Sequence, residues 1–304
     1  MRRIAVIFGL ALAAVMPVFA AVETTVYDSS YPITVRSEAP GVRIDWNRQA
    51  AYITTSEEAP IQSMGFVARD TAYQMALAAA HKRLETLFST LHLTAYATVN
   101  EAVSTGYLPQ ETLEVVEKSL RPVVSSWDTE SRTCQLTCAL PLTGIGTVGE
   151  LTAQMLKVEQ EAFAKQANAP QHHPLNAKLS PSKKPVKQLS AGPYTGIILD
   201  CTRLHYTPTL LPKLVAKDGA ELWGMRDVNP QAVQARGLVG FATTLKDATK
   251  SDRVGISPYI IRPLGTCGPA QGDLVLSDED AKQLADLQAS CDCLTNMSVV
   301  ILLD

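Results

Sequence analysis

The feature that most constrains the fold is a break in composition near the middle of the chain. Residues 164–193 contain five prolines and five lysines, and no acidic residue occurs between Glu161 and Asp200. A segment with this composition and without helical or strand periodicity buries too little apolar surface to offset its ordering entropy. We therefore predict a flexible, extended linker at 164–193, between an N-terminal segment, 21–163, and a C-terminal segment, 194–304.

The five lysines of this linker suit an anionic surface, such as lipid headgroups or a cell-wall polymer. Runs of like charge more often serve only to keep a spacer hydrated, and we favour that interpretation. The pair His172–His173 has no further ligand nearby in the sequence and is interpreted as loop.

The first twenty residues have the plan of a secretory signal peptide. Arg2 and Arg3 precede an almost unbroken apolar run, 4–18, which is followed by the small residue Ala20. The run is short for a membrane span, although an uncleaved anchor is the alternative. We predict cleavage before Ala21, no membrane span after cleavage, and an exported chain that is periplasmic or otherwise extracytoplasmic.

The composition of the mature chain excludes few functions. The whole chain has 27 Lys and Arg against 30 Asp and Glu, and the signal peptide takes two of the arginines, which leaves 25 against 30. A mildly acidic chain does not indicate nucleic-acid binding. The 284 residues that remain of 304 after cleavage are enough for two sizeable cores.

The N-terminal segment has the pattern of an α+β domain. Its clearest signal is a long helix at 66–91, on which small and apolar residues recur every four positions. These residues are Ala68, Ala72, Ala76, Ala80, Leu84 and Phe88. The alanines predict a close approach of the helix to a sheet. The other predicted elements are strands at 42–46, 50–54, 93–99, 123–127 and 133–140, and helices at 110–120 and 149–163.

The C-terminal segment predicts a second α+β domain. The apolar runs 195–200 and 298–303 are typical of strands covered on both faces. Asp218-Gly219 favours a hairpin, Asn229 and Pro230 predict the start of a helix that ends before Gly237, and Ser277 predicts the cap of another helix. Further strands are expected at 258–264 and 274–276.

The six cysteines follow the predicted signal peptide, so an oxidising environment and disulfides are expected. Cys134 and Cys138 lie in one predicted strand, where four extended residues separate their α-carbons by roughly 13 Å, too far for a bond. Cys267 lies in a predicted glycine-proline turn, and Cys291 follows a helix. We therefore favour a Cys267–Cys291 bond, with Cys267–Cys293 next.

No catalytic, cofactor-binding or metal site is predicted. A nucleophilic Cys201 with His205 as base is conceivable at the end of an apolar strand, but no third orienting group is identifiable. Cys291-Asp-Cys293 lacks the partners of a zinc site. The residues 265–268, Gly-Thr-Cys-Gly, are predicted to form a turn rather than a phosphate loop.

Two further groups of residues have ordinary structural explanations. Asp278 and Asp280 suit the negative charge favoured at a helix N-terminus. Trp46, Trp127 and Trp223 lie in strand-like runs, and we expect core or half-buried positions for them.

Several soft motifs resemble known families. Ile44–Trp46, the alanine-rich helix, Thr98–Asn100 and Cys138–Gly144 resemble the bacterial envelope family of the twenty-kilodalton lipoprotein, whose domain is similar to the N-terminal part of flagellar assembly protein T. The segments Tyr194–Asp200 and Gly237–Ala242, with the terminal apolar run, resemble an accessory domain that often follows it. No lipid-attachment cysteine is present near the predicted cut, so the resemblance does not extend to lipid anchoring.

The resemblance implies a structural role in the envelope or flagellum without catalysis or cofactors. We expect an exported, non-enzymatic protein that binds another envelope or flagellar component. The alternatives are a periplasmic hydrolase with an unrecognised site and a cell-wall or carbohydrate-binding module. A pocket of titratable groups would favour the hydrolase. Exposed aromatic side chains in a groove would favour the carbohydrate-binding module. An apolar patch or an open sheet edge would favour the partner-binding protein.

Overall fold

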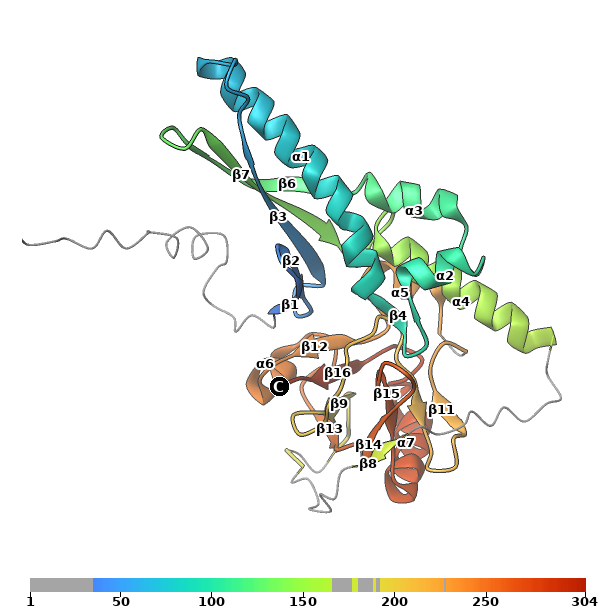
Figure 1. Cartoon of the computed structure of the whole chain (residues 1–304). Helices are drawn as coiled ribbons and strands as arrows, with labels where there is room; N and C mark the ends of the chain where they lie inside the picture. Colours follow the sequence, from blue (N-terminus) through green and yellow to red (C-terminus); the bar gives the residue numbers. More distant parts are fainter. Residues whose placement is uncertain (1–34, 166–176, 180–187, 190–191, 227) are drawn as a thin grey trace, which may run out of the picture. The chain divides into compact units, whose positions relative to one another are not determined.

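The computed structural model describes residues 35–165, 177–179, 188–189, 192–226 and 228–304, and these belong to one compact unit (Figure 1). The predicted signal peptide and most of the predicted linker lie outside the described residues. The fold is α+β, as the sequence predicts, with helices packed on several separate sheets.

The N-terminal half is built on an antiparallel sheet with the strand order β1-β2-β3-β7-β6. Its strands are β1 (Val35–Ala39), β2 (Val42–Asp45), β3 (Ala50–Glu58), β6 (Arg121–Asp128) and β7 (Thr133–Pro141). Helix α1 (Gly65–Thr90) lies along one face of this sheet (Figure 1). The strands predicted at 42–46, 50–54, 123–127 and 133–140 are confirmed in this sheet, and β3 continues four residues beyond its predicted end.

The alanine stripe of α1 explains how closely the helix approaches the sheet. All six residues predicted to face the core are buried. Near the middle of the helix, the hydroxyl of Thr55 in β3 donates a hydrogen bond to the backbone carbonyl of Ala76 at 2.8 Å. Such a contact between strand and helix backbone requires a small side chain at this position. Leu84 and Phe88 fill the wider space toward the other end.

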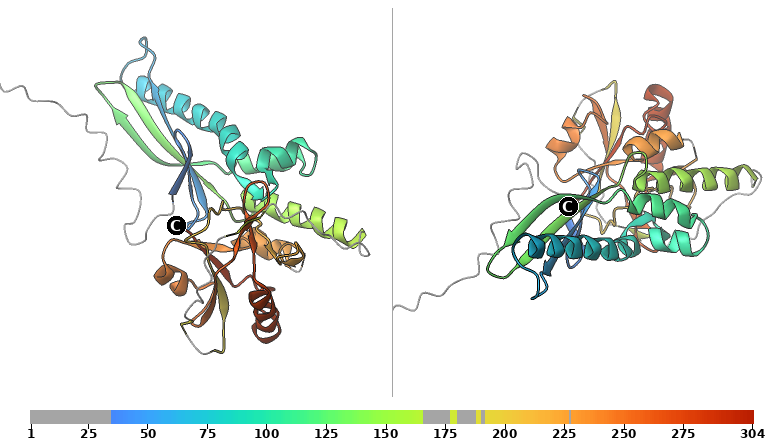
Figure 2. Two further views of the ribbon diagram at one scale, coloured as in Figure 1. Left: turned by 60° about the horizontal axis from the view of Figure 1, so that its bottom comes forward. Right: turned by 90° about the horizontal axis from the view of Figure 1, so that it is seen from above.

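A cluster of shorter elements follows α1. These are the hairpin β4 (His92–Thr94) and β5 (Ala97–Thr98) and the helices α2 (Val99–Ser104), α3 (Gln110–Glu117) and α4 (Val148–Lys165). Helices α2, α3 and α4 gather at one end of the sheet (Figure 2). The helices predicted at 110–120 and 149–163 are confirmed as α3 and α4.

The single strand predicted at 93–99 is wrong, because the chain turns at its centre. The hydroxyl of Thr94 accepts hydrogen bonds from the amides of Tyr96 and Ala97, both at 3.2 Å, which forms a turn. Thr98 and Glu101 then form a capping box that starts α2. The alternation of apolar and polar residues at 93–99 favoured one strand, so the turn at Thr94 and the helix cap at Thr98 were missed.

The C-terminal half contains two sheets. The parallel sheet has the order β12-β16-β9-β13, from β9 (Gly196–Asp200), β12 (Gly240–Ala242), β13 (Pro258–Ile261) and β16 (Val299–Leu302). The second sheet has the order β11-β10-β15-β14-β8, from β8 (Lys178–Leu179), β10 (Leu214–Val215), β11 (Glu221–Trp223), β14 (Gly265–Cys267) and β15 (Asp273–Val275). Helices α5 (Pro230–Arg236), α6 (Leu245–Lys250) and α7 (Asp278–Cys291) complete this half.

Several local predictions for this half are confirmed. Every residue of β9 and β16 is buried, as expected of strands covered on both faces. Asn229 caps α5 through its side chain, and Gly237 ends the helix with a φ of 73°. Ser277 caps α7 by accepting a hydrogen bond from the amide of Asp280.

The turn predicted at 265–268 is wrong, because Gly265–Cys267 forms strand β14 between β15 and β8. A Cβ atom at Gly265 would overlap the backbone carbonyl of Lys178 in β8. The glycine therefore permits the close approach of two strands rather than a reversal of the chain.

The two halves share one hydrophobic cluster, which includes residues from Val42 to Leu303. The amides of Leu210 and Leu211 donate to the carbonyls of His92 and Leu93, at 3.1 and 2.8 Å. The second half therefore packs directly against the hairpin β4–β5 rather than being held only by a spacer.

The described parts of the predicted linker are bonded to the C-terminal half. Lys178–Leu179 forms β8 at the edge of a sheet, and the side chain of Gln188 bonds to the backbone of Ile260 at 2.8 and 2.9 Å. Composition did not predict these contacts, because backbone pairing at a sheet edge needs little apolar surface.

Candidate functional site

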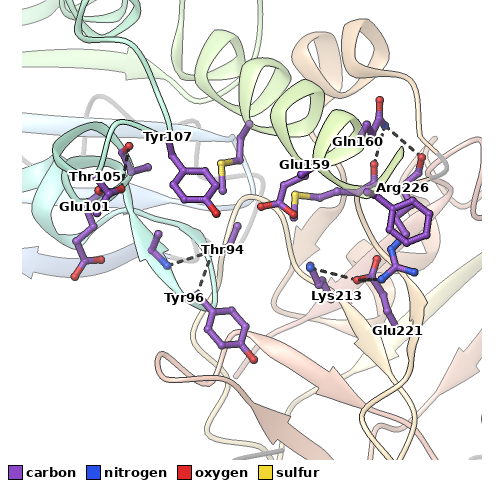
Figure 3. Close-up of a pocket in the computed structure, with 16 residues that line it drawn as sticks. Thr94, Tyr96, Glu101, Thr105, Tyr107, Glu159, Gln160, Lys213, Glu221 and Arg226 are labelled. Carbon is purple, nitrogen blue, oxygen red and sulfur yellow. Dashed lines mark hydrogen bonds and ion pairs between the residues drawn. The ribbon is translucent and has the colours of Figure 1, made fainter. Parts of the chain in front are cut away.

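A pocket of about 610 Å³ lies where the two halves meet (Figure 3). Its walls come from the hairpin β4–β5, helices α2 and α4, and the region of β10 and β11. Segments far apart in the sequence therefore build one cavity, within the size range of small-molecule sites.

Helix α4 forms one side of the pocket through residues spaced by four. Met155, Glu159 and Phe163 line the cavity, and this spacing places them on one face of the helix. Gln160, beside them, donates from Nε2 to the carbonyls of Met225 and Val228 at 2.8 and 2.9 Å. These bonds fix the loop after β11 against α4 and so define the width of the pocket.

An ionic cluster occupies the wall from the C-terminal half. Oε2 of Glu221, whose side chain is only 4 % exposed, lies 3.2 Å from Nζ of Lys213 and 3.4 Å from a guanidinium nitrogen of Arg226. The guanidinium of Arg226 also lies 4.2 Å above the ring of Phe163. The two cations compensate the buried carboxylate.

A second buried acid lies behind this wall. The carboxylate of Asp273 accepts a hydrogen bond from the amide of Lys213 at 2.9 Å. Burial raises the pKa of Asp273 to about 7, against the lowering effects of that hydrogen bond and of the Lys213 charge, and the charge of Glu221 raises it further. Asp273 is not a lining residue, but it positions the backbone that presents Lys213.

Two tyrosines and two further carboxylates complete the lining of the pocket. Tyr96 and Tyr107 are each 50 % exposed and line the pocket. Glu101 accepts hydrogen bonds from the amide and the hydroxyl of Thr98, which lower its pKa. Glu159 is half-buried and forms no hydrogen bond or ion pair with any described residue. Figure 3 shows Tyr107 and Glu159 directed into the space that separates them from Lys213.

These groups do not form a recognisable catalytic set. None of the sixteen described lining residues is a cysteine, histidine or serine. Glu101 is held ionised by its hydrogen bonds, and Glu221 is enclosed between two cations. A general acid with a raised pKa opposite a free base is therefore not identifiable among the described lining residues.

The candidate residues from the sequence lie elsewhere. Cys201 is buried, and burial, with the charges of Asp200 and Asp304, raises its pKa well above the ordinary range, while His205 is exposed. A thiol that is both buried and protonated is a poor nucleophile. Asp200, at the end of the same strand, instead accepts a hydrogen bond from Nε of Arg262 at 3.0 Å.

The remaining acidic and aromatic candidates have structural roles. Asp278 forms an exposed ion pair with Lys217 at 2.7 Å, at the start of α7. Trp46 is buried with its ring centre 5.0 Å from that of Phe241, and Trp223 is buried as well. Trp127 packs as a partly buried residue against a small apolar cluster.

The structure corrects the predicted disulfide. Cys291 and Cys293 form the bond, with α-carbons 5.1 Å apart, and Cys267 is a free, buried thiol. The expected Cys267–Cys291 pairing is wrong because Cys267 lies in strand β14, packed against Val215 and Val275, rather than in a loop. Cys134 and Cys138 are buried free thiols.

The described residues hold neither a cluster of metal-ligating side chains nor a helix that could cross a membrane. These residues contain no group of three or more histidine, cysteine or acidic side chains placed to hold a metal ion. Within the same part of the chain, no helix combines the length and apolar character needed to cross a membrane.

A second surface was not predicted from the sequence. The loop between β3 and α1, with the first turn of α1, presents four large apolar side chains that are 61–82 % exposed. We call these residues, Ile61, Met64, Phe66 and Val67, the apolar tip. The guanidinium of Arg132 donates to the carbonyls of Pro60 and Ser63 at 2.8 and 2.6 Å. The hairpin β6–β7 thus holds the loop in shape.

Comparison with known protein families gave a match in the C-terminal half of the chain. Residues 196–304 match the family described as Treponema pallidum Tp0624, second domain. The match begins close to the boundary at 194 predicted from the sequence, and it covers about a third of the chain. No curated protein matches the chain.

Proposed function

We propose that this chain is an exported, non-enzymatic cell-envelope protein that acts by binding a partner protein through the apolar tip. The observation that carries the proposal is the gathering of four large, exposed apolar side chains within seven residues. Scattered apolar residues are normal on a protein surface, but a contiguous group favours an interaction site. Envelope or flagellar assembly is the setting that the family resemblance suggests.

The charges around the tip favour a basic partner. Glu58, Asp70, Asp128 and Glu130 are exposed on the elements that border it. Arg69 is an exposed cation in the second turn of α1, and the guanidinium of Arg132 donates to the loop carbonyls. We therefore expect a partner surface with an apolar groove flanked by lysine or arginine.

Strand β6 offers a second contact beside the tip. In the described part of the chain it pairs only with β7, so its outer edge leaves backbone groups available to another strand. A partner that fills its groove with the tip can also add a strand along this edge.

Photocrosslinking tests the proposal at a single residue. A photoreactive phenylalanine analogue replaces Phe66 in cells that make the full chain, and the same analogue replaces Ile256 as a control. Ile256 is 97 % exposed but lies in the other half of the chain. We expect one defined envelope protein to be crosslinked at position 66 and not at position 256. The same products at both positions, or none at 66, would overturn the proposal.

Reconstitution decides whether that contact is specific. The crosslinked protein is purified and its affinity is measured for the wild type, for the double variant Met64→Ser/Phe66→Ser and for Ile256→Ser. Loss of two exposed anchors is expected to weaken binding at least tenfold, from about 1–2 kcal/mol for each hot-spot side chain. Equal affinity of the tip variant and the wild type would exclude the tip as the docking site.

A carbohydrate-binding module is the second candidate, because Tyr96 and Tyr107 expose aromatic rings in a pocket. Soluble cell-wall glycan fragments that bind the wild type and fail to bind Tyr107→Ala would favour it. The hydrolase alternative has no such observation, since the pocket lacks an identifiable acid–base pair among its described residues.

A further inference from the structure

We infer that the pocket between the two halves binds a small zwitterion, an amino acid or short peptide with free termini, with its ammonium at Glu159 and its carboxylate at Lys213. This site lies apart from the apolar tip and does not depend on the proposed partner. Figure 3 shows the two charged side chains on different walls of the cavity.

Glu159 is the anionic end of the site. Its half-buried carboxylate lines the pocket and has no hydrogen bond or ion pair with a described residue. A carboxylate that loses part of its water needs a cation or several donors in exchange. An ammonium group meets this need, and the exposed ring of Tyr107, which also lines the pocket, can add a cation–π contact.

Lys213 is the cationic end. An ammonium group has three N–H donors, and the charged contact that Nζ makes in the described structure is the one with Glu221 at 3.2 Å. Its backbone is fixed by the hydrogen bond to Asp273, so the side chain is presented from a rigid strand start. A ligand carboxylate can therefore bind Nζ without displacing Glu221.

The space between these charges suits an apolar side chain. Met155 and Met225 line the pocket with flexible thioether chains, which adapt to apolar groups of different shape. Glu159 and Lys213 form no ion pair with each other, so the pocket holds two opposite charges apart. A zwitterion supplies a cation to Glu159 and a second anion to Lys213, which has Glu221 as its charged partner, whereas a neutral sugar would leave Glu159 without a cation in a partly dehydrated site.

The probe is the tripeptide Ala-Leu-Ala in four forms, with free termini, N-acetylated, C-amidated and blocked at both ends. Calorimetry with the full chain measures the affinity of each form. We expect the free form to bind and each single block to weaken binding at least about tenfold, as for the loss of one charge-assisted hydrogen bond. Equal binding of all four forms, or no binding of the free form at millimolar concentration, would overturn the inference.

Glu159→Gln tests which wall holds the ammonium. In this variant, N-acetylation should no longer weaken binding, while C-amidation should still do so. Glu161→Gln is the matched control, because Glu161 is exposed on the same helix and does not line the pocket. If Glu159→Gln still discriminates against the acetylated peptide as the wild type does, the ammonium is not at Glu159.

The tip variant separates this inference from the proposed function. Met64→Ser/Phe66→Ser should bind the tripeptide with wild-type affinity, because the tip residues do not line the pocket. Thermal unfolding of every variant confirms that it is folded. Failure of partner binding at the tip therefore leaves the peptide result unaffected. Failure of peptide binding in the pocket likewise leaves the test of the tip unaffected.

Discussion

The side-chain amide of Gln160 donates a hydrogen bond to the backbone carbonyl of Met225 at 2.8 Å and so fastens α4 to the C-terminal half of the chain. The same nitrogen lies 2.9 Å from the carbonyl of Val228. One side chain thus satisfies two loop carbonyls that would otherwise need water, and it sets the distance between two walls of the pocket.

Replacing Gln160 should loosen this junction. Gln160→Leu leaves the carbonyls of Met225 and Val228 without this donor, and we expect the free energy of unfolding to fall by about 1–3 kcal/mol. Lys157→Leu, at an exposed position of the same helix, should change it by less than about 0.5 kcal/mol. Denaturant titration measures both, and equal effects would mean that the junction contributes nothing specific.

The shared core also predicts how the chain behaves when its middle is cut. The composition of residues 164–193 predicts that limited trypsin treatment cuts first between Lys165 and Lys187. Because the hydrophobic cluster includes residues of both halves, the two fragments should remain together on native size exclusion and separate only in denaturant. Fragments that elute separately without denaturant would contradict a common core.

Local signals in the sequence predicted much of the fold. The alanine stripe identified the buried face of α1, and Asn229, Pro230 and Gly237 marked both ends of α5. These signals succeed because a cap depends on residues next to it in the chain, and because the spacing of small residues by four marks one face of a helix. The relation between the halves depends on contacts such as Leu211 with Leu93, which no local pattern encodes.

The stripe itself gives a direct test of close packing. Ala76→Leu inserts a larger side chain where the carbonyl of residue 76 accepts a hydrogen bond from Thr55. We expect the free energy of unfolding to fall by about 1–3 kcal/mol. Ala78→Leu, on the exposed face of α1, should be nearly neutral, since leucine and alanine have similar helix propensities. Similar melting temperatures for the two variants would show that the helix lies farther from β3.

Thiol labelling tests the corrected disulfide. Burial raises the pKa of Cys138 to about 11; burial, with the charge of Asp273, raises that of Cys267 to about 12. In the folded protein at pH 8, iodoacetamide should therefore label neither residue. Unfolding without reductant should expose four labelled thiols by mass, including Cys267, and reduction should add Cys291 and Cys293. A Cys267 that stays unlabelled after unfolding would restore the first prediction.

The candidate pocket could not be predicted from the sequence, because its lining residues come together only in the folded chain. Glu159, Tyr107 and Lys213 come from three separate parts of the chain, and each alone has the pattern of an ordinary surface residue. The one local signal is the spacing of Met155, Glu159 and Phe163, which places a carboxylate on the apolar face of α4. A charged residue within an apolar helix face could have directed attention to this wall.

Asp273 predicts an unusual dependence of stability on pH. Burial raises the pKa of this carboxyl to about 7 in the folded state, so the folded chain holds the proton more tightly than the unfolded chain does. The associated stability is fully present below the unfolded pKa of about 3.9, and it is lost as the pH rises through about 7. The stability contributed by Asp273 therefore falls as the pH rises, whereas the stability contributed by a carboxylate in a salt bridge falls as the pH drops.

Asp273→Asn removes this loss, because the amide stays neutral and its oxygen can still accept the hydrogen bond from Lys213. Relative to the wild type, the variant should gain up to about 4 kcal/mol between pH 4 and pH 8, the equivalent of three pKa units. Asp286→Asn, exposed on α7, should follow the wild type over the whole range. Urea titrations at several pH values measure the difference, and parallel curves for Asp273→Asn and the wild type would mean that Asp273 titrates normally.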